Sequence, residues 1–225
     1  MVPDNARRGR HFSPAFAAAR NHPEALTKNL LAIADDDGLP GIVRASALDL
    51  IGRCEDVLVR SRVAPLIGDD DPLVRAAVIG VLSGAENPAD LQPIVPALKD
   101  EYMAVRIAAA RALVAAPIAQ DPRGPWHLAS GEWRASLWAK ADFPETHMVI
   151  GGTALVLRDP PAAERAFREA LRQDPQLIDA WTMVIRIRAA VGDREGAHAA
   201  TLEALGVNPN DPALVSMLAQ FDEVP

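Results

Sequence analysis

Residues 72–84 read PLVRAAVIGVLSG, and variants of this stretch stand at 41–52 (GIVRASALDLIG) and 103–115 (MAVRIAAARALVA). Counted from the valine of each Val-Arg pair, positions +4, +7 and +8 are apolar, which places them on one face of a helix. The valines recur at one constant interval: Val43, Val74 and Val105. One amphipathic helix repeated at a fixed interval predicts a stack of helical repeats.

A partner helix is expected before each copy, because apolar residues continue at helical spacing in the intervening segments. We expect these helices at 23–34, 56–67 and 89–98, with an earlier capping helix at 14–20. Pro65 and Pro96, separated by the same interval as the valines, fall late in two of them. Proline removes a backbone donor, so each should bend its helix.

Acidic residues precede every copy of the repeated helix, at 35–37, 69–71 and 100–101. Carboxylates suit the first turn of a helix, where they accept free N–H groups and meet the positive end of the dipole. We therefore expect them to cap helices and to pair with the repeated arginines in a ladder between repeats. These arginines are Arg44, Arg75 and Arg106. A calcium loop needs alternating oxygen ligands and a final glutamate, a spacing that none of the three turns has.

Helix pairs in which the second helix carries Asp…Val-Arg resemble the short HEAT-like repeats. The resemblance implies an all-α protein in which residues 12–117 form HEAT-like repeats, preceded by a flexible arm at 1–11. Arg7, Arg8 and Arg10 cluster in this arm, which we interpret as a solvated tail.

The second half of the chain changes to a slightly longer period. Ala163, Phe167, Ala170 and Pro175 recur at the same relative spacing as Ala197, Thr201, Ala204 and Pro209. This pattern resembles the second helix of the tetratricopeptide repeat, and Gly151 and Trp181 stand where its first helix has a small residue and a tryptophan. The resemblance implies tetratricopeptide repeats over 144–225, with a capping helix at 212–221. The fold class expected for the chain is therefore all-α, an α-solenoid (superhelix) of HEAT-like repeats followed by tetratricopeptide repeats.

Residues 118–143 form the expected junction, because prolines and Gly124 interrupt the helical pattern before a helix at 130–141. Three of the four tryptophans lie here: Trp126, Trp133 and Trp138. Clustered tryptophans are typical of binding hot spots, but they also fill the space where two helical stacks meet. We favour packing and keep binding as the alternative.

Composition and charge exclude several classes of protein. The chain has 225 residues, 49% of them hydrophobic, which excludes disorder, and a net charge of −7, which argues against a nucleic-acid binder. No apolar stretch approaches the roughly 20 residues that span a bilayer. Without a secretory signal the chain as written is expected in the cytoplasm, or in the periplasm if it is a processed or excised domain.

Catalytic and metal-binding patterns are not found in the sequence. The five histidines are isolated, the single cysteine is Cys54, and no H-E-x-x-H, C-x-x-C or G-x-S-x-G motif occurs. We therefore predict no catalytic residues, no metal and no cofactor. Bilin lyases also contain HEAT-like repeats, which leaves a bilin-handling enzyme as a remote alternative.

The order of parts is similar to the C-terminal region of bacterial multihaem cytochrome c-like proteins, where HEAT-like repeats precede tetratricopeptide repeats. The similarity covers about 11–220 and includes the segment EWRASLWAKAD at 132–142. It implies an accessory or docking module, possible partners being c-type cytochromes. Because the chain has no C-x-x-C-H motif, it carries no covalent c-type haem.

The function predicted from this organisation is a non-catalytic protein–protein interaction scaffold that binds a partner or peptide in its groove. First helices line the concave face of tetratricopeptide arrays, so the resemblance implies that Met148, Gly152, Leu155, Asp179, Thr182 and Arg186 lie there. Arg186 is the best candidate to bind a partner carboxylate, because its planar fork binds both oxygens.

Overall fold

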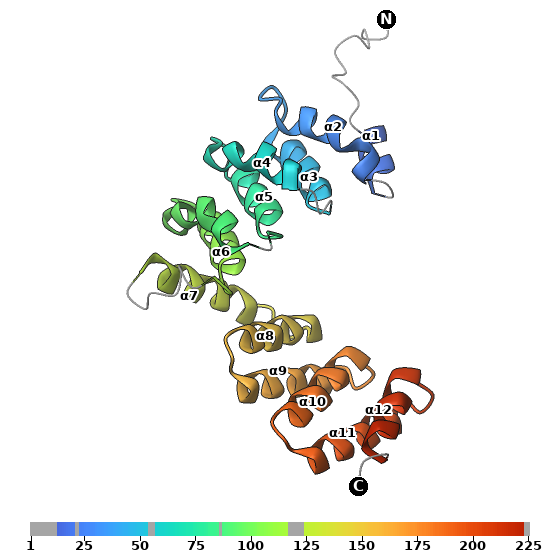
Figure 1. Ribbon diagram of the computed structural model, residues 1–225. Coiled ribbons are helices and arrows are strands. Elements are labelled where there is room, and N and C mark those ends of the chain that lie inside the picture. The colour runs from blue at the N-terminus through green and yellow to red at the C-terminus, as the bar shows by residue number, and fades with distance from the viewer. Residues whose placement is uncertain (1–12, 21–22, 54–56, 86, 117–123, 223–225) are drawn as a thin grey trace, which may run out of the picture. The chain divides into compact units, whose positions relative to one another are not determined.

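All regular secondary structure is helical in the residues that the computed structural model describes, which are 13–20, 23–53, 57–85, 87–116 and 124–222. The chain divides into two compact units, the first ending at Trp133 and the second beginning at Arg134. Within each unit, helices pack against their neighbours along the chain (Figure 1). The predicted all-α class is confirmed, and each unit has the successive helix packing of an α-solenoid.

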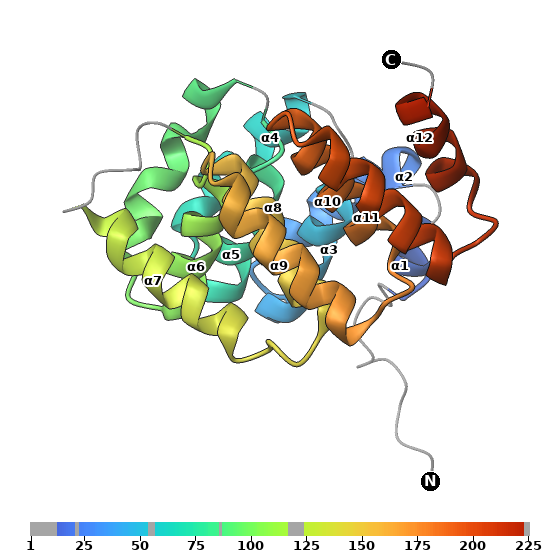
Figure 2. The same ribbon diagram turned by 90° about the horizontal axis from the view of Figure 1, so that it is seen from below.

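Unit 1 is organised around three equivalent helices, α3 (Gly41–Ile51), α5 (Pro72–Leu82) and α6 (Met103–Ala112). Their first residues keep the constant interval of the Val-Arg pairs. Helix α3 packs against α5 and α5 against α6, a succession that is also visible from below in Figure 2. The valines of the Val-Arg pairs in α5 and α6 are fully buried.

The partner elements of unit 1 are α1 (Ser13–Ala19), α2 (Pro23–Ala34), α4 (Val57–Val63), and the 3₁₀ helices η2 (Ala64–Gly68) and η3 (Pro88–Lys99). The expected helix at 23–34 is found with those bounds. The prediction of bent α-helices was wrong, because the proline-containing segments adopt 3₁₀ geometry instead: Pro65 lies in the first turn of η2, and Pro96 lies inside η3. In an α-helix proline clashes with the carbonyl four residues earlier and lacks the N–H donor, so an α-helix is disfavoured where a proline falls in its interior.

Unit 2 consists of helix pairs that repeat at a constant interval. Its helices are α8 (Pro144–Val156), α9 (Pro160–Gln173), α10 (Ile178–Ala190), α11 (Arg194–Val207) and α12 (Pro212–Asp222). Helices α8 and α10 have equal lengths, as do α9 and α11, and each later helix is offset from its earlier equivalent as Ala197 is from Ala163. Asp159 and Asp193 cap α9 and α11 at equivalent positions, each accepting a hydrogen bond from a backbone N–H of the first turn.

A small residue opposite an aromatic ring brings α8 and α9 close together. A Cβ atom at Gly151 would stand 2.6 Å from Phe167 Cε1, so no larger residue fits without movement. Phe167 and Trp181 belong to the core of unit 2, together with small residues such as Ala163 and Ala197. Small residues therefore allow the helices of unit 2 to approach closely.

Helix α7 (Pro125–Trp138) begins before residue 130 and ends before residue 141, so it is longer at its start than predicted. The division between the two units falls inside this helix. None of the described helices combines the length and apolar character needed to cross a membrane.

Candidate binding groove

Each repeated arginine of unit 1 forms an ion pair with one acidic side chain that lies 25 or 26 residues further along the chain. The pairs are Arg44–Asp69, Arg75–Asp100 and Arg106–Glu132. In the second pair, Arg75 Nε and Nη2 donate to the two carboxylate oxygens at 2.8 and 2.9 Å. The predicted ladder is confirmed for Asp69 and Asp100, whereas Arg106 pairs with a carboxylate outside the acidic turns. Sequence reasoning missed Glu132 because this residue lies in the expected junction and follows its arginine by one residue more than the others do. The predicted capping is found at α5, where Asp71 accepts a hydrogen bond from the Leu73 N–H. It was wrong for α3 and α6, whose N-cap residues Pro40 and Tyr102 form no side-chain cap hydrogen bond.

The same arginines also hold the loop that precedes their own helix. Arg75 Nη1 donates to the carbonyl oxygens of Asp69 and Asp70 at 2.7 and 3.1 Å. Arg106 Nη1 donates to those of Asp100 and Glu101 at 2.7 and 3.0 Å. The hydrogen bond from Arg75 lowers the pKa of the Asp100 carboxyl. The donors of the ladder arginines are therefore engaged within the protein.

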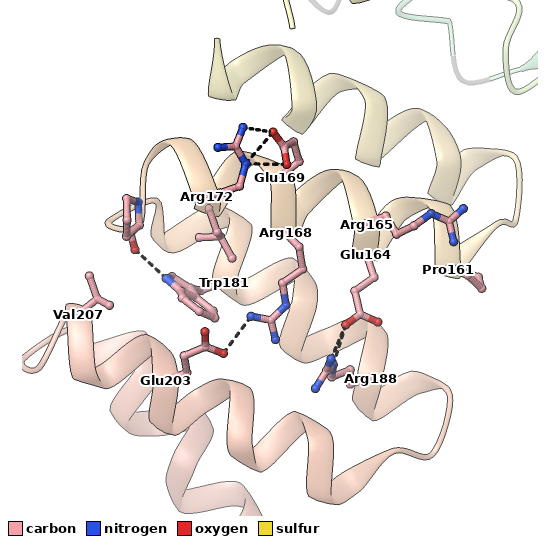
Figure 3. A pocket seen from close by; sticks show the side chains of 12 residues that line it. Pro161, Glu164, Arg165, Arg168, Glu169, Arg172, Trp181, Arg188, Glu203 and Val207 are labelled. Carbon is pink, nitrogen blue, oxygen red and sulfur yellow. Dashed lines mark hydrogen bonds and ion pairs between the residues drawn. The ribbon is translucent and has the colours of Figure 1, made fainter. Parts of the chain in front are cut away.

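Arginines have a different place in unit 2. Arg165, Arg168 and Arg172 recur at i, i+3 and i+7 along α9, so they share one face of this helix. They line a groove of about 880 Å³ to which α10 contributes Trp181 and Arg188 and α11 contributes Glu203 and Val207 (Figure 3). Nothing in the tetratricopeptide resemblance drew attention to this face, although the arginine spacing was visible in the sequence.

Three carboxylates of the groove neutralise three of its arginines. Arg168 pairs with Glu203 at 2.9 Å and lies over the ring of Trp181, 5.2 Å from its centroid. Arg188 pairs with Glu164 at 2.7 Å. Arg172 pairs with Glu169, and its hydrogen bonds lower the pKa of that carboxyl.

Arg165 is the fourth arginine of the groove, and it has no carboxylate partner among the described residues. Its side chain extends away from the three pairs in Figure 3, is exposed, and has no hydrogen-bond or ion-pair partner among the residues that the structure describes. The groove therefore carries one positive charge that its own carboxylates do not balance. The groove also has exposed apolar surface, contributed by Pro161, Pro175 and Val207.

A second hollow of about 630 Å³ shares Arg165, Glu169 and Arg172 with the groove and is also lined by α8 and by Trp138 of α7. Here the buried ring of His147 meets Trp138 edge to face, with 6.4 Å between the ring centroids. The arginine face of α9 thus borders two adjoining depressions.

The first-helix residues expected to bind a partner lie outside these depressions. Met148 and Leu155 are half-buried and pack against the core of unit 2, and Gly152 and Thr182 are half-buried as well. Asp179 and Arg186 are exposed, and within the described chain neither has an ion-pair partner. The concave role of this set stays a prediction.

The three junction tryptophans have different surroundings. Trp126 Nε1 donates to the carbonyl oxygen of Ala110 at 3.3 Å, and Trp133 is buried, both within unit 1. Trp138 belongs to unit 2 and is exposed. Of the three, only Trp138 lines a depression of the candidate site.

No cluster of three or more His, Cys, Asp or Glu side chains that could hold a metal occurs in the described ranges. His147 is buried, and its Nε2 lies 2.9 Å from the carbonyl oxygen of Ala141. Cys54, His11, His22 and the N-terminal arm lie outside the described residues.

Comparison with protein families identifies the repeats of the first half. Residues 24–114 match the family model of HEAT repeats. Unit 1 therefore contains HEAT-like repeats, a family that commonly mediates protein–protein interaction and is typically non-enzymatic. No curated protein and no solved structure is significantly similar to the chain. The resemblances to tetratricopeptide repeats and to multihaem cytochrome c-like proteins stay predictions.

Proposed function

We propose that the protein is a non-catalytic scaffold and that unit 2 holds a carboxylate-bearing segment of a partner protein along α9. The observation that carries this proposal is Arg165, the exposed and unpaired cation of a groove whose other arginines are neutralised by carboxylates of the described chain. HEAT-like repeats in unit 1 support the broader role in protein–protein interaction.

The chemistry of the groove favours an acidic peptide segment over other ligands. A guanidinium group binds both oxygens of a carboxylate, and a hydrogen bond to a charged group contributes about 1.5–3 kcal/mol. Pro161 lies beside Arg165 and offers apolar contact next to the bound carboxylate, and Val207 offers apolar contact at the other end of the groove (Figure 3). Arg168 and Arg188 are already held by their carboxylates, so ordering these two side chains on binding costs little entropy.

Selection of peptides by the full-length protein tests the proposal. A displayed library of random twelve-residue peptides is panned against the wild-type chain, and the enriched sequences are synthesised and titrated by fluorescence anisotropy. We expect enrichment of acidic sequences. We also expect Arg165→Ala to weaken the best of them by about tenfold, the loss of roughly one charge-assisted hydrogen bond.

Arg186→Ala is the matched control, since it removes an equally exposed arginine from α10 that has no ion-pair partner within the described chain. It should leave the affinity unchanged if the groove is the site. If Arg186→Ala weakens binding and Arg165→Ala does not, the first-helix surface binds the partner and the groove proposal is wrong. Enrichment of basic sequences alone would also contradict it.

A further inference from the structure

Unit 1 exposes large apolar side chains at the starts of its three equivalent helices. Ile42 in α3, Leu73 in α5 and Met103 in α6 have exposed fractions of 60%, 46% and 56%. Ile42 and Leu73 occupy the same position of the repeat, and Met103 lies one position earlier. We call these three residues the apolar row. Since α3 packs on α5 and α5 on α6, the row crosses three neighbouring helices.

In α5, the middle helix of the three, the face that carries Leu73 continues with small uncharged residues. Leu73, Ala76 and Gly80 share one face of this helix, and none of them carries a charge. A Cβ atom at Gly80 would meet no other atom within 4 Å, so the space above this face is open. Tyr102 stands next to Met103 and is itself exposed, with Arg75 5.5 Å from its ring centroid.

One carboxylate per repeat lies close to the apolar row along the chain. Asp70 and Glu101 are exposed at equivalent repeat positions. Asp37 stands two positions earlier in its repeat, has a side chain that is 93% exposed, and lies 3.4 Å from Arg44. The ladder arginines bind the carboxylates of Asp69 and Asp100, whereas the carboxylates of Asp70 and Glu101 have no hydrogen-bond or ion-pair partner within the described part of the chain. Each repeat therefore has an exposed apolar side chain and an exposed carboxylate close together along the chain.

Packing does not account for the apolar row, because no described residue covers it. Single exposed apolar side chains are common on soluble proteins, whereas apolar groups that recur on neighbouring helices and are bordered by polar ones favour an interaction surface. A nucleic acid is a poor occupant, since its phosphates would meet the carboxylates of Asp37, Asp70 and Glu101. A segment that pairs positive charges with apolar side chains complements both features.

We propose that the apolar row is a docking surface for a partner segment in which apolar residues alternate with lysine or arginine. Neighbouring packed helices lie about 8–10 Å apart, and a polyproline II chain rises about 3.1 Å per residue with three residues per turn, so that every third side chain points the same way. The segment therefore presents one apolar residue about every third position, with basic residues between them. This surface is separate from the groove of unit 2 and selects the opposite charge.

Peptides of matched composition test the docking surface on the full-length protein. The probe is a fluorescein-labelled peptide in which Leu-Lys-Ser is repeated four times, and the control peptides replace every lysine with glutamate or every leucine with serine. Anisotropy titrations at 150 mM salt should show binding of the probe and at least fivefold weaker binding of the leucine-free peptide. Substitutions in the apolar row should leave the affinity of the glutamate peptide unchanged.

Two variants locate the binding. Leu73→Ser should weaken the Leu-Lys-Ser probe at least fivefold with an unchanged melting temperature, and Asp70→Asn combined with Glu101→Gln should weaken it and flatten its salt dependence. Leu58→Ser, which changes another exposed leucine of unit 1, is the control and should have no effect. The proposal is overturned if the probe does not bind at 1 mM protein, if Leu73→Ser leaves its affinity unchanged, or if the leucine-free peptide binds equally well.

Discussion

Units 1 and 2 are both stacks of helix pairs with apolar cores, and in both units ion pairs join successive helix pairs. In unit 1 one arginine of each repeat pairs with a later carboxylate, and the side chains of these arginines are only 6–18% exposed. In unit 2 Arg168 pairs with Glu203 and Arg188 with Glu164, and these arginine side chains are 27–30% exposed on the wall of the groove. The comparison shows that one architecture can place the arginines that join its repeats either inside the stack or at its surface.

The difference also decides which groups reach the surface. Unit 1 uses its repeated arginines internally, and this leaves Asp70 and Glu101 exposed beside the apolar row. Unit 2 places the arginines of α9 on the wall of a groove, and Arg165 is exposed there without an ion-pair partner among the described residues. The two proposed binding surfaces have opposite charge preferences for this reason.

Removal of the aromatic ring in unit 2 should have the largest effect. Phe167→Ala deletes a side chain that is almost fully buried, and such a deletion destabilises a domain by about 3–5 kcal/mol. Hydrogen exchange followed by mass spectrometry should show faster exchange in α8 to α11, with α3, α5 and α6 unchanged. The control Phe143→Ala alters an exposed ring and should shift stability by less than about 0.5 kcal/mol. Equal loosening of both units would contradict the separation of their cores.

Breaking the first contact of the ladder should affect unit 1 alone. The Arg44 side chain is nearly buried, pairs with Asp69, and donates from Nε to the carbonyl oxygen of Ala34 at 2.9 Å. Arg44→Ala leaves that carboxylate without its partner, at an expected loss of about 3 kcal/mol measured by urea unfolding. Arg62→Ala, which removes an exposed pair with Asp35, should change stability by less than about 1 kcal/mol. Similar losses of unfolding free energy in the two variants would show that burial of the Arg44–Asp69 pair does not add to its effect on stability.

The smallest expected effect is a change in acid sensitivity. Because the Arg75 hydrogen bond lowers the pKa of Asp100 in the folded protein, this pair stabilises unit 1 above the ordinary carboxyl pKa of about 3.9. The stabilisation is lost as the pH falls through the lower folded value. In Asp100→Asn, the free energy of unfolding should therefore fall less steeply below about pH 5, by at most about 1.4 kcal/mol per pH unit.

Urea titrations from pH 7 to pH 2 measure this slope. Asp70→Asn removes a neighbouring exposed carboxylate and serves as the matched control, with the wild-type slope expected. A wild-type slope in Asp100→Asn itself would rule out the pair as a source of the acid sensitivity.

The fold of both units was predictable because the repeat periods fix where equivalent residues stand. The Val-Arg pairs predicted the three equivalent helices of unit 1, and the spacing of Gly151, Phe167 and Trp181 predicted the helical repeats of unit 2. The 3₁₀ geometry around Pro65 and Pro96 was not predictable in the same way. Periodicity locates an apolar face without showing whether a proline bends an α-helix or tightens it.

The binding groove was harder to predict, because it depends on which charges remain unpaired. The sequence shows Arg165, Arg168 and Arg172 on one helical face but not that Glu203, 35 residues later, neutralises the second of them. Arg165 stands out only when the partners of its neighbours are known. The apolar row was also hard to predict. The sequence shows Ile42 and Leu73 at equal repeat positions, but only the structure shows that both side chains are exposed.

The most direct test of two surfaces with opposite preferences is a set of four dissociation constants measured on the full-length chain. The best acidic peptide from the selection and the Leu-Lys-Ser probe are each titrated against Arg165→Ala and Leu73→Ser. We predict that Arg165→Ala weakens only the acidic peptide and that Leu73→Ser weakens only the basic one. If either substitution weakens both peptides equally, or neither, the two units do not carry separate binding surfaces.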